Sequence, residues 1–150
     1  LSELLANGKL LEIVVVGGVL RGIGEEPGGR GFALPLLRGR FGPLLATLAL
    51  WPVWLFWHLP AFLLRPEFAL GAWLGLSAGI LCAAAWSTLL YDKTRSVLMI
   101  VIWHALINIT RSIAGAASSD AFFAFAQIMF GMGLMIVIYW LIRRPAKYPR

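Results

Sequence analysis

Eight polar or charged residues of the chain lie within or beside long apolar stretches, where such side chains are rare. An ionisable group at the centre of a bilayer costs at least about 2.5–3.5 kcal/mol, so each of these residues is a candidate for function. A carboxylate can act as general base on water, and an imidazole can position that water or pass the proton. A neutral imidazole and an amide can donate hydrogen bonds to a developing oxyanion. These residues, whose types together fit hydrolysis, are Glu12, Arg21, Glu25, Glu26, Arg30, His58, His104 and Asn108.

The densest cluster is the acidic pair Glu25-Glu26, followed closely by Arg30. Two adjacent carboxylates near a membrane repel each other, and the arginine can neutralise one of them. In a helix, Glu26 and Arg30 are four residues apart and meet on one face, which leaves Glu25 free to point elsewhere. The alternative is an interfacial ion pair that ends the helix, with the Pro-Gly-Gly sequence at 27–29 as the breaker.

The two histidines of the chain each stand in an apolar, tryptophan-containing segment. His58 follows Trp54 by one helical turn, and Pro60 should kink the helix just beyond it. The alternative for His58 is a capping or interfacial histidine in an aromatic belt. His104 and Asn108 are four residues apart and share one helix face. Their alternative is interhelical hydrogen bonding.

A zinc site is the alternative to chemistry without a metal. Catalytic zinc takes three protein ligands and a water, and Glu25, His58 and His104 could supply those ligands. The sequence contains no His-Glu-x-x-His pattern and no serine-centred or cysteine-centred triad. We therefore predict no cofactor, with zinc as the alternative.

The composition excludes a soluble globular domain. Of the 150 residues, 60% are hydrophobic and 13% are charged, against about 45–50% and about 25% in soluble domains, and the mean hydropathy is +0.83. Since a transmembrane helix needs about 20 apolar residues, we expect an all-α, polytopic membrane helix bundle with about five transmembrane helices. The expected helices cover residues 10–24, which can continue toward 37, and then 41–64, 68–91, 96–110 with an extension through 113–117, and 121–142.

The loop cations predict the orientation of this bundle. One side holds three of them, Lys9, Arg65 and Arg111. The other side holds nine: Arg30, Arg38, Arg40, Lys93, Arg95, Arg143, Arg144, Lys147 and Arg150. We therefore expect the C-terminus in the cytoplasm and the N-terminus outside. The net charge of +6 is assigned to these loops, and no nucleic-acid partner is predicted.

Counting along the helices predicts how deep the polar groups lie. At about 1.5 Å per residue, Glu25 lies about 22 Å from the outer start of its helix, roughly 8 Å below the cytoplasmic face of a ~30 Å core. His104 lies about 12 Å from the cytoplasmic start of its own helix, so the two depths agree. His58 comes out near 21 Å if its helix starts at Leu44, which is too deep unless that helix projects past the surface or residues 41–48 are interfacial.

A stripe of small residues, Gly71, Gly75 and Gly79, recurs at four-residue spacing in the third expected helix. Such a stripe lets a neighbouring backbone approach closely. We expect it to pack against another helix of the same chain, with a dimer interface as the alternative.

Three short motifs resemble those of a known family. Residues 25–30 (Glu-Glu-Pro-Gly-Gly-Arg) resemble its EExxxR motif. Trp54 and His58 resemble its second motif, an aromatic residue four positions before a histidine, and His104 with Asn108 resembles its HxxxN motif. In this order and on successive hydrophobic segments, they resemble the CPBP family of CAAX proteases and bacteriocin-processing enzymes, also called type II CAAX prenyl endopeptidases.

The resemblance implies an enzyme, a glutamate-type intramembrane endopeptidase that cleaves a hydrophobic or prenylated C-terminal peptide. Glu25 would activate the water, aided by His58. The residues implied to hold the oxyanion are His104 and Asn108, and those implied to support the site are Glu26, Arg30 and Trp54. We expect a single transmembrane domain over residues 1–150 with a catalytic core at 20–115. Because family members usually have more helices, the chain resembles an N-terminally shortened version of the family fold.

The expected partners are the lipid bilayer and the peptide substrate, and the expected location is the cell membrane with the catalytic opening on the cytoplasmic side. Three alternative functions stand beside the protease. The first is a non-catalytic membrane scaffold or bacteriocin-immunity protein with the same fold, and the second is a zinc-dependent membrane protease. The third is a small transporter or proton relay, which ranks last because the sequence lacks the paired broken helices of inverted repeats.

Overall fold

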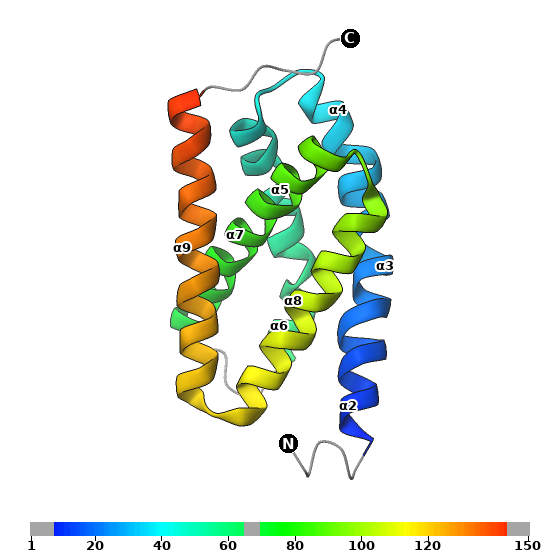
Figure 1. Ribbon diagram of the computed structural model, residues 1–150, viewed down its shortest axis with the longest axis vertical. Coiled ribbons are helices and arrows are strands. Elements are labelled where there is room, and N and C mark those ends of the chain that lie inside the picture. Colours follow the sequence, from blue (N-terminus) through cyan, green and yellow to red (C-terminus); the bar gives the residue numbers. More distant parts are fainter. Residues whose placement is uncertain (1–7, 65–69, 144–150) are drawn as a thin grey trace.

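The computed structural model describes residues 8–64 and 70–143, and these residues form helices and no strand. Figure 1 shows the helices as a bundle with α9 at one edge of the view and the N-terminal helical segments at the other. Helices α7 and α8 lie between them and pack against both each other and α9. The expected all-α membrane helix bundle is confirmed.

The elements follow the predicted ranges closely. In chain order they are α2 (Lys9–Glu12), η1 (Ile13–Leu20), α3 (Arg21–Glu26), η2 (Pro27–Ala33), α4 (Leu34–Arg38), α5 (Pro43–Trp57), α6 (Leu59–Leu63), α7 (Leu70–Thr94), α8 (Val97–Ala117) and α9 (Ser119–Arg143). By length and composition, three of the described helices could cross a membrane, namely α7, α8 and α9. Helix α5 is apolar but shorter, with 15 residues. The expected number of about five spans therefore stays a prediction.

The segments α2, η1, α3, η2 and α4 run on as one N-terminal helix over residues 9–38, in which η1 and η2 are π-helical. The residues at the junctions between these segments keep right-handed helical angles, Pro27 included. The predicted continuation toward 37 is confirmed, and the alternative that Pro-Gly-Gly ends the helix is wrong. Local π-helical adjustment satisfies the backbone groups that proline and glycine would otherwise free.

A buried stripe runs along this N-terminal helix at intervals of four residues. Its members, all buried, are Gly18, Gly22, Glu26, Arg30, Leu34 and Arg38. In a regular α-helix a spacing of four drifts by about 40° per step, so the two ends of the stripe would face about 200° apart. The π-helical turns, with their i→i+5 hydrogen bonds, hold more residues per turn. They reduce this drift and keep the stripe directed at the bundle.

Two glycines of the stripe bring the N-terminal helix close to α8. A Cβ built on Gly22 would lie 2.9 Å from the carbonyl oxygen of Val101, and one built on Gly18 would lie 3.3 Å from that of Ala105. Such close approach needs residues without a side chain. The contact places Glu26, one turn beyond Gly22, beside α8.

The predicted glycine stripe on α7 behaves differently. Gly71, Gly75 and Gly79 are exposed, and a Cβ on any of them would meet no atom within 4 Å. The expectation that this stripe packs against another helix of the chain is therefore wrong for the described residues. Helix α7 instead packs against α9 through Gly133, where a Cβ would lie 2.6 Å from that of Cys82.

Helix α5 ends just before His58, and α6 begins just after it. Pro60 is the second residue of α6, where its missing N–H is tolerated. The predicted interruption next to Pro60 is confirmed, and it falls at the histidine itself. His58 therefore stands at the junction of two helices.

A buried ion pair closes the end of the bundle near α4. Nε and Nη2 of Arg38 donate to Oδ1 and Oδ2 of Asp92 at 3.1 and 2.9 Å, while Nη1 donates to the carbonyl oxygen of Phe41 at 2.8 Å. The side chain of Arg38 is 3% exposed. Counting Arg38 as a loop cation was therefore wrong, because this arginine ties α4 to the end of α7. The same count was wrong for Arg30, which is buried within η2.

Candidate active site

A fully buried carboxylate, Glu26, connects α3 to α8. Its Oε1 accepts a hydrogen bond from Nδ1 of His104 at 2.6 Å. Arg30 lies one turn further on, with Nε 3.3 Å from Oε2 and Nη1 3.5 Å from Oε1. An unpaired carboxylate would be costly to bury, and here two cationic or proton-donating side chains share it. The predicted meeting of Glu26 and Arg30 on one face is confirmed.

Trp54 on α5 contacts four of the predicted site residues. Its indole Nε1 donates to Oε2 of Glu25 at 2.6 Å. The guanidinium carbon of Arg30 lies 3.8 Å from the centre of its ring, which is cation–π geometry. The ring also meets His58 and His104 edge-on, with centroids 6.1 and 5.6 Å away.

These contacts show that the two acidic neighbours have different surroundings. Glu26 is enclosed by His104 and Arg30, whereas Glu25 is partly exposed and bonded to Trp54. The expectation that Glu25 points away from the Glu26–Arg30 pair is confirmed. Helix geometry accounts for the difference, since consecutive residues are turned by about 100°.

His58 contacts the same tryptophan through its backbone as well. The distance from Nδ1 of His58 to the carbonyl oxygen of Trp54 is 2.8 Å. A carbonyl oxygen only accepts, so Nδ1 carries the hydrogen and Nε2 of the neutral ring keeps its lone pair. Counting along straight helices placed His58 much deeper than His104. The structure nevertheless brings the two histidines close together, because the same indole ring lies beside both.

A pocket of about 240 Å³ opens beside Glu25, between α3–η2 and α5. Its lining consists of Gly24, Glu25, Gly28, Gly29, Arg30, Leu50, Val53, Trp54 and Trp57. A Cβ on any of these three glycines would meet no atom within 4 Å, so the absence of side chains leaves this wall open. Of the two adjacent carboxylates, Glu25 is the one that lines the pocket.

Asn108 is the predicted site residue with the fewest contacts. It lies on α8 one turn after His104 and is partly buried. No hydrogen bond joins its side chain to another described residue. The shared face with His104 follows from the helix, but among the described residues no hydrogen bond links Asn108 to Glu25 or Trp54.

The three residues considered as zinc ligands are spread through this site. Within residues 8–64 and 70–143, no group of three His, Cys, Asp or Glu side chains is close enough together to hold a metal ion. Glu25, His58 and His104 meet through Trp54 instead of facing one another. The zinc alternative stays a prediction.

Sequence reasoning did not identify two features that position the site. Trp54 was expected to support the site, but its bond to Glu25 joins residues 29 positions apart in the chain, which a local motif cannot reveal. The close contacts of Gly18 and Gly22 were also missed. The four-residue spacing of these two glycines could have predicted the contact. We applied this rule to the glycines of α7 and not to those of the N-terminal helix.

Comparison with known proteins identifies the family. Residues 7–110 match the family described as "Type II CAAX prenyl endopeptidase Rce1-like". This range contains all three motifs and every predicted site residue. No curated protein and no solved structure matches the chain. The match confirms the resemblance carried by the motifs, and the chain belongs to the Rce1-like family of type II CAAX prenyl endopeptidases, a family of membrane proteases.

Proposed function

We propose that this protein is a glutamate-type intramembrane endopeptidase that cleaves a hydrophobic or prenylated C-terminal peptide. The observation that carries the proposal is the pair of adjacent carboxylates with different surroundings. Glu25 lines an open pocket and is held by Trp54. Glu26 is buried and bonded to His104. One carboxylate can therefore meet water while the other orients an imidazole.

In the proposed reaction, Glu25 removes a proton from a water molecule, and the resulting hydroxide attacks the scissile carbonyl carbon. The C=O bond becomes a C–O⁻ single bond in the tetrahedral intermediate. When this intermediate collapses, the C–N bond breaks and the proton held by Glu25 passes to the leaving nitrogen. His58 supports the first step, since Nε2 of its neutral ring can accept a hydrogen bond from the water.

His104 and Asn108 are proposed to stabilise the oxyanion. Nδ1 of His104 already donates to Glu26, so Nε2 can donate to the oxyanion when the ring is protonated. Glu26 is well placed to stabilise that positive charge, as a buried carboxylate does for an imidazolium in other hydrolases. The amide of Asn108 can donate whatever the charge on the ring.

The chemistry of the pocket wall supports an apolar substrate. Val53 and Trp57 line the pocket and are 67% and 69% exposed. In a membrane-spanning bundle, such exposed side chains face lipid or a lipid-soluble ligand. A prenylated or apolar peptide can therefore reach Glu25 from the bilayer. Its scissile peptide bond would enter the pocket beside Gly24, Gly28 and Gly29, where no side chain fills the space.

The test is cleavage of a fluorescent, prenylated C-terminal peptide by the full chain in lipid nanodiscs. Glu25→Gln keeps the size of the side chain but removes the base, and we expect kcat to fall by about 10²–10⁴-fold. Asp120→Asn, an exposed acidic residue at the start of α9, is the matched control and should keep wild-type turnover. Equal turnover in all three proteins would overturn the proposal, and peptide binding without cleavage would favour the non-catalytic scaffold.

A chelator separates the metal-free mechanism from the zinc alternative. We expect turnover to be unchanged after incubation with 1,10-phenanthroline and dialysis. Loss of turnover that added zinc restores would instead support zinc bound by Glu25, His58 and His104.

We also propose that the pocket opens on the cytoplasmic side. The exposed cations that support this orientation lie at the α4–α5 turn, at the α7–α8 turn and at the end of α9: Arg40, Lys93, Arg95 and Arg143. The test uses Arg40→Cys and Ser118→Cys, which lie in turns at opposite ends of the bundle. In intact cells, a membrane-impermeant maleimide should label only the cysteine at 118, and the reverse pattern would contradict the orientation.

A further inference from the structure

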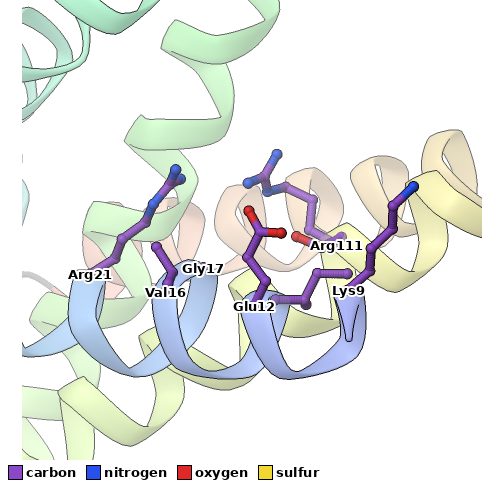
Figure 2. A pocket seen from close by; sticks show the side chains of 8 residues that line it. Lys9, Glu12, Val16, Gly17, Arg21 and Arg111 are labelled. Atoms are coloured by element: carbon purple, nitrogen blue, oxygen red, sulfur yellow. The ribbon is translucent and has the colours of Figure 1, made fainter. Parts of the chain in front are cut away.

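A second pocket lies along the N-terminal half of the long helix, between that helix and the last turns of α8. It has a volume of about 270 Å³, and four charged side chains line it: Lys9, Glu12, Arg21 and Arg111. In Figure 2 the side chains of Lys9, Glu12 and Arg21 project to the same side of the N-terminal helix, and Arg111 of α8 lies on that side. The Glu12 carboxylate and the Arg111 guanidinium lie between the head groups of Lys9 and Arg21 in that view.

The pocket carries an excess of positive charge in an apolar setting. Three cations surround one carboxylate, while the aliphatic side chains Val15, Val19 and Leu20 on the same helix are 40%, 40% and 55% exposed. Arg21 lies twelve residues beyond Lys9, which corresponds to about 18 Å of helix. If the helix spans a ~30 Å hydrocarbon core, this arginine lies near its middle, where an unmatched charge is costly.

The direction of the Arg21 side chain brings its guanidinium toward the other charged groups of the pocket. Helical side chains lean toward the N-terminus of their helix, and in Figure 2 the Arg21 side chain extends toward Glu12 and Arg111. An arginine near the centre of a bilayer can thus extend its guanidinium toward the membrane surface. The guanidinium groups of Arg21 and Arg111 present several N–H donors, and the Lys9 amine lies at the other end of the row.

We propose that this pocket binds the phosphate-bearing head group of an anionic phospholipid. Guanidinium groups pair with phosphate oxygens through two parallel hydrogen bonds, and basic pockets between transmembrane helices bind anionic lipid head groups. The volume is slightly below the about 300 Å³ at which pockets for drug-sized molecules begin, so it suits a head group. The acyl chains would then extend along the exposed aliphatic face of the helix.

A lipid is favoured over a free anion because the charged and apolar surfaces are contiguous. Val16 lines the pocket itself and is 48% exposed. A free phosphate would use the cations alone, whereas a phospholipid would use both surfaces. The excess of cations favours a lipid with net negative charge over a zwitterionic one. This inference does not depend on peptide cleavage by the neighbouring site.

The test measures binding of a tail-labelled phosphatidylglycerol to the full chain in neutral detergent micelles. The competitors are unlabelled phosphatidylglycerol, phosphatidylcholine with the same acyl chains, and inorganic phosphate. We expect phosphatidylglycerol to compete at least tenfold better than phosphatidylcholine, with little competition by millimolar phosphate. Equal competition by both lipids would overturn the proposal, and full competition by phosphate alone would show a free-anion site instead.

Charge variants locate the binding site. Arg21→Gln and Arg111→Gln should each weaken phosphatidylglycerol binding by about fivefold, while Arg40→Gln at the other end of the bundle should change it less than twofold. Glu12→Gln removes a like charge and should strengthen binding. If Glu12→Gln weakens binding, or if Arg40→Gln matches Arg21→Gln, the anion does not bind in this pocket. If Arg21→Gln fails to fold, Arg111→Gln keeps the test decisive, because it removes a cation of the same pocket from the other helix.

Discussion

The close approach of α3 to α8 at Gly22 allows the effect of Gly22→Ala on the free energy of unfolding to be predicted. Gly22→Ala places a Cβ 2.9 Å from the carbonyl oxygen of Val101, whereas ordinary contact begins at 3.4 Å, so the helices must separate by about 0.5 Å. Overpacking of this kind costs about 1–3 kcal/mol, and the gain in helix propensity returns about 0.5–1 kcal/mol. The free energy of unfolding should therefore fall by about 1.3 kcal/mol at the middle of these ranges, and by at most about 2.5 kcal/mol.

Gly24→Ala is the matched control, since it lies two residues away on the same helix and its Cβ would meet nothing within 4 Å. Only the gain in helix propensity applies there, so Gly24→Ala should be neutral or slightly stabilising. The assay is thermal unfolding of the purified protein in detergent, followed by tryptophan fluorescence. At about 2–4 °C per kcal/mol for a chain of this size, Gly22→Ala should lower the Tm by several degrees. Shifts of equal size and sign in the two variants would refute the close packing at Gly22.

The same substitution should reach the candidate site. Glu26 is one turn beyond Gly22, and its hydrogen bond to His104 measures 2.6 Å. A separation of about 0.5 Å would stretch this bond to the long end of the usual range of about 2.7–3.2 Å. We therefore expect Gly22→Ala to lower peptide turnover more than its loss of stability alone would, when both are measured at a temperature where the protein stays folded.

Two other contacts give separate predictions. Trp54→Phe keeps the aromatic ring but removes the donor to Glu25. Since a hydrogen bond to a charged group contributes about 1.5–3 kcal/mol, kcat should fall about 10–150-fold, with the Tm little changed. An unchanged kcat would contradict the role of the indole N–H. Asp92→Asn leaves the buried Arg38 without its anion and should cost about 3 kcal/mol, measured as a fall in Tm that Asp120→Asn does not show. A similar Tm for both aspartate variants would contradict the contribution of the buried ion pair.

Much of the fold could be predicted because lipid imposes simple rules on sequence. Uninterrupted apolar stretches of sufficient length mark helices, and the ranges expected for α7, α8 and α9 agree with the structure to within a few residues. The alternative that Pro27 and its glycines end the helix was wrong because rules for helix breakers come from water-exposed helices. Within a bundle, π-helical turns accommodate proline and glycine, so the helix continues through them.

The site was predictable to the extent that helix periodicity determines it. The pairing of Glu26 with Arg30 follows from four-residue spacing alone. The contacts between α3, α5 and α8 depend on which helix faces which, and local spacing does not determine this. Both Trp54–Glu25 and Glu26–His104 are contacts of this kind. Arg38 was misplaced for a related reason, since its partner Asp92 lies 54 residues away.

The buried stripe with its period of four fixes both the rotation and the length of the N-terminal helix. Deleting one residue between Glu26 and Arg30 would turn everything beyond it by about 100°, taking Arg30 and Arg38 away from their partners without loss of helix. An insertion of four residues at the same place would instead leave the direction of the later side chains nearly unchanged. It would, however, move Arg38 about 6 Å further along the axis, beyond reach of Asp92. The two carboxylates are thus held at a set position by a glycine contact at one end and an ion pair at the other. Changes of length in this helix should be tolerated before Gly18 or after Arg38, but not between them.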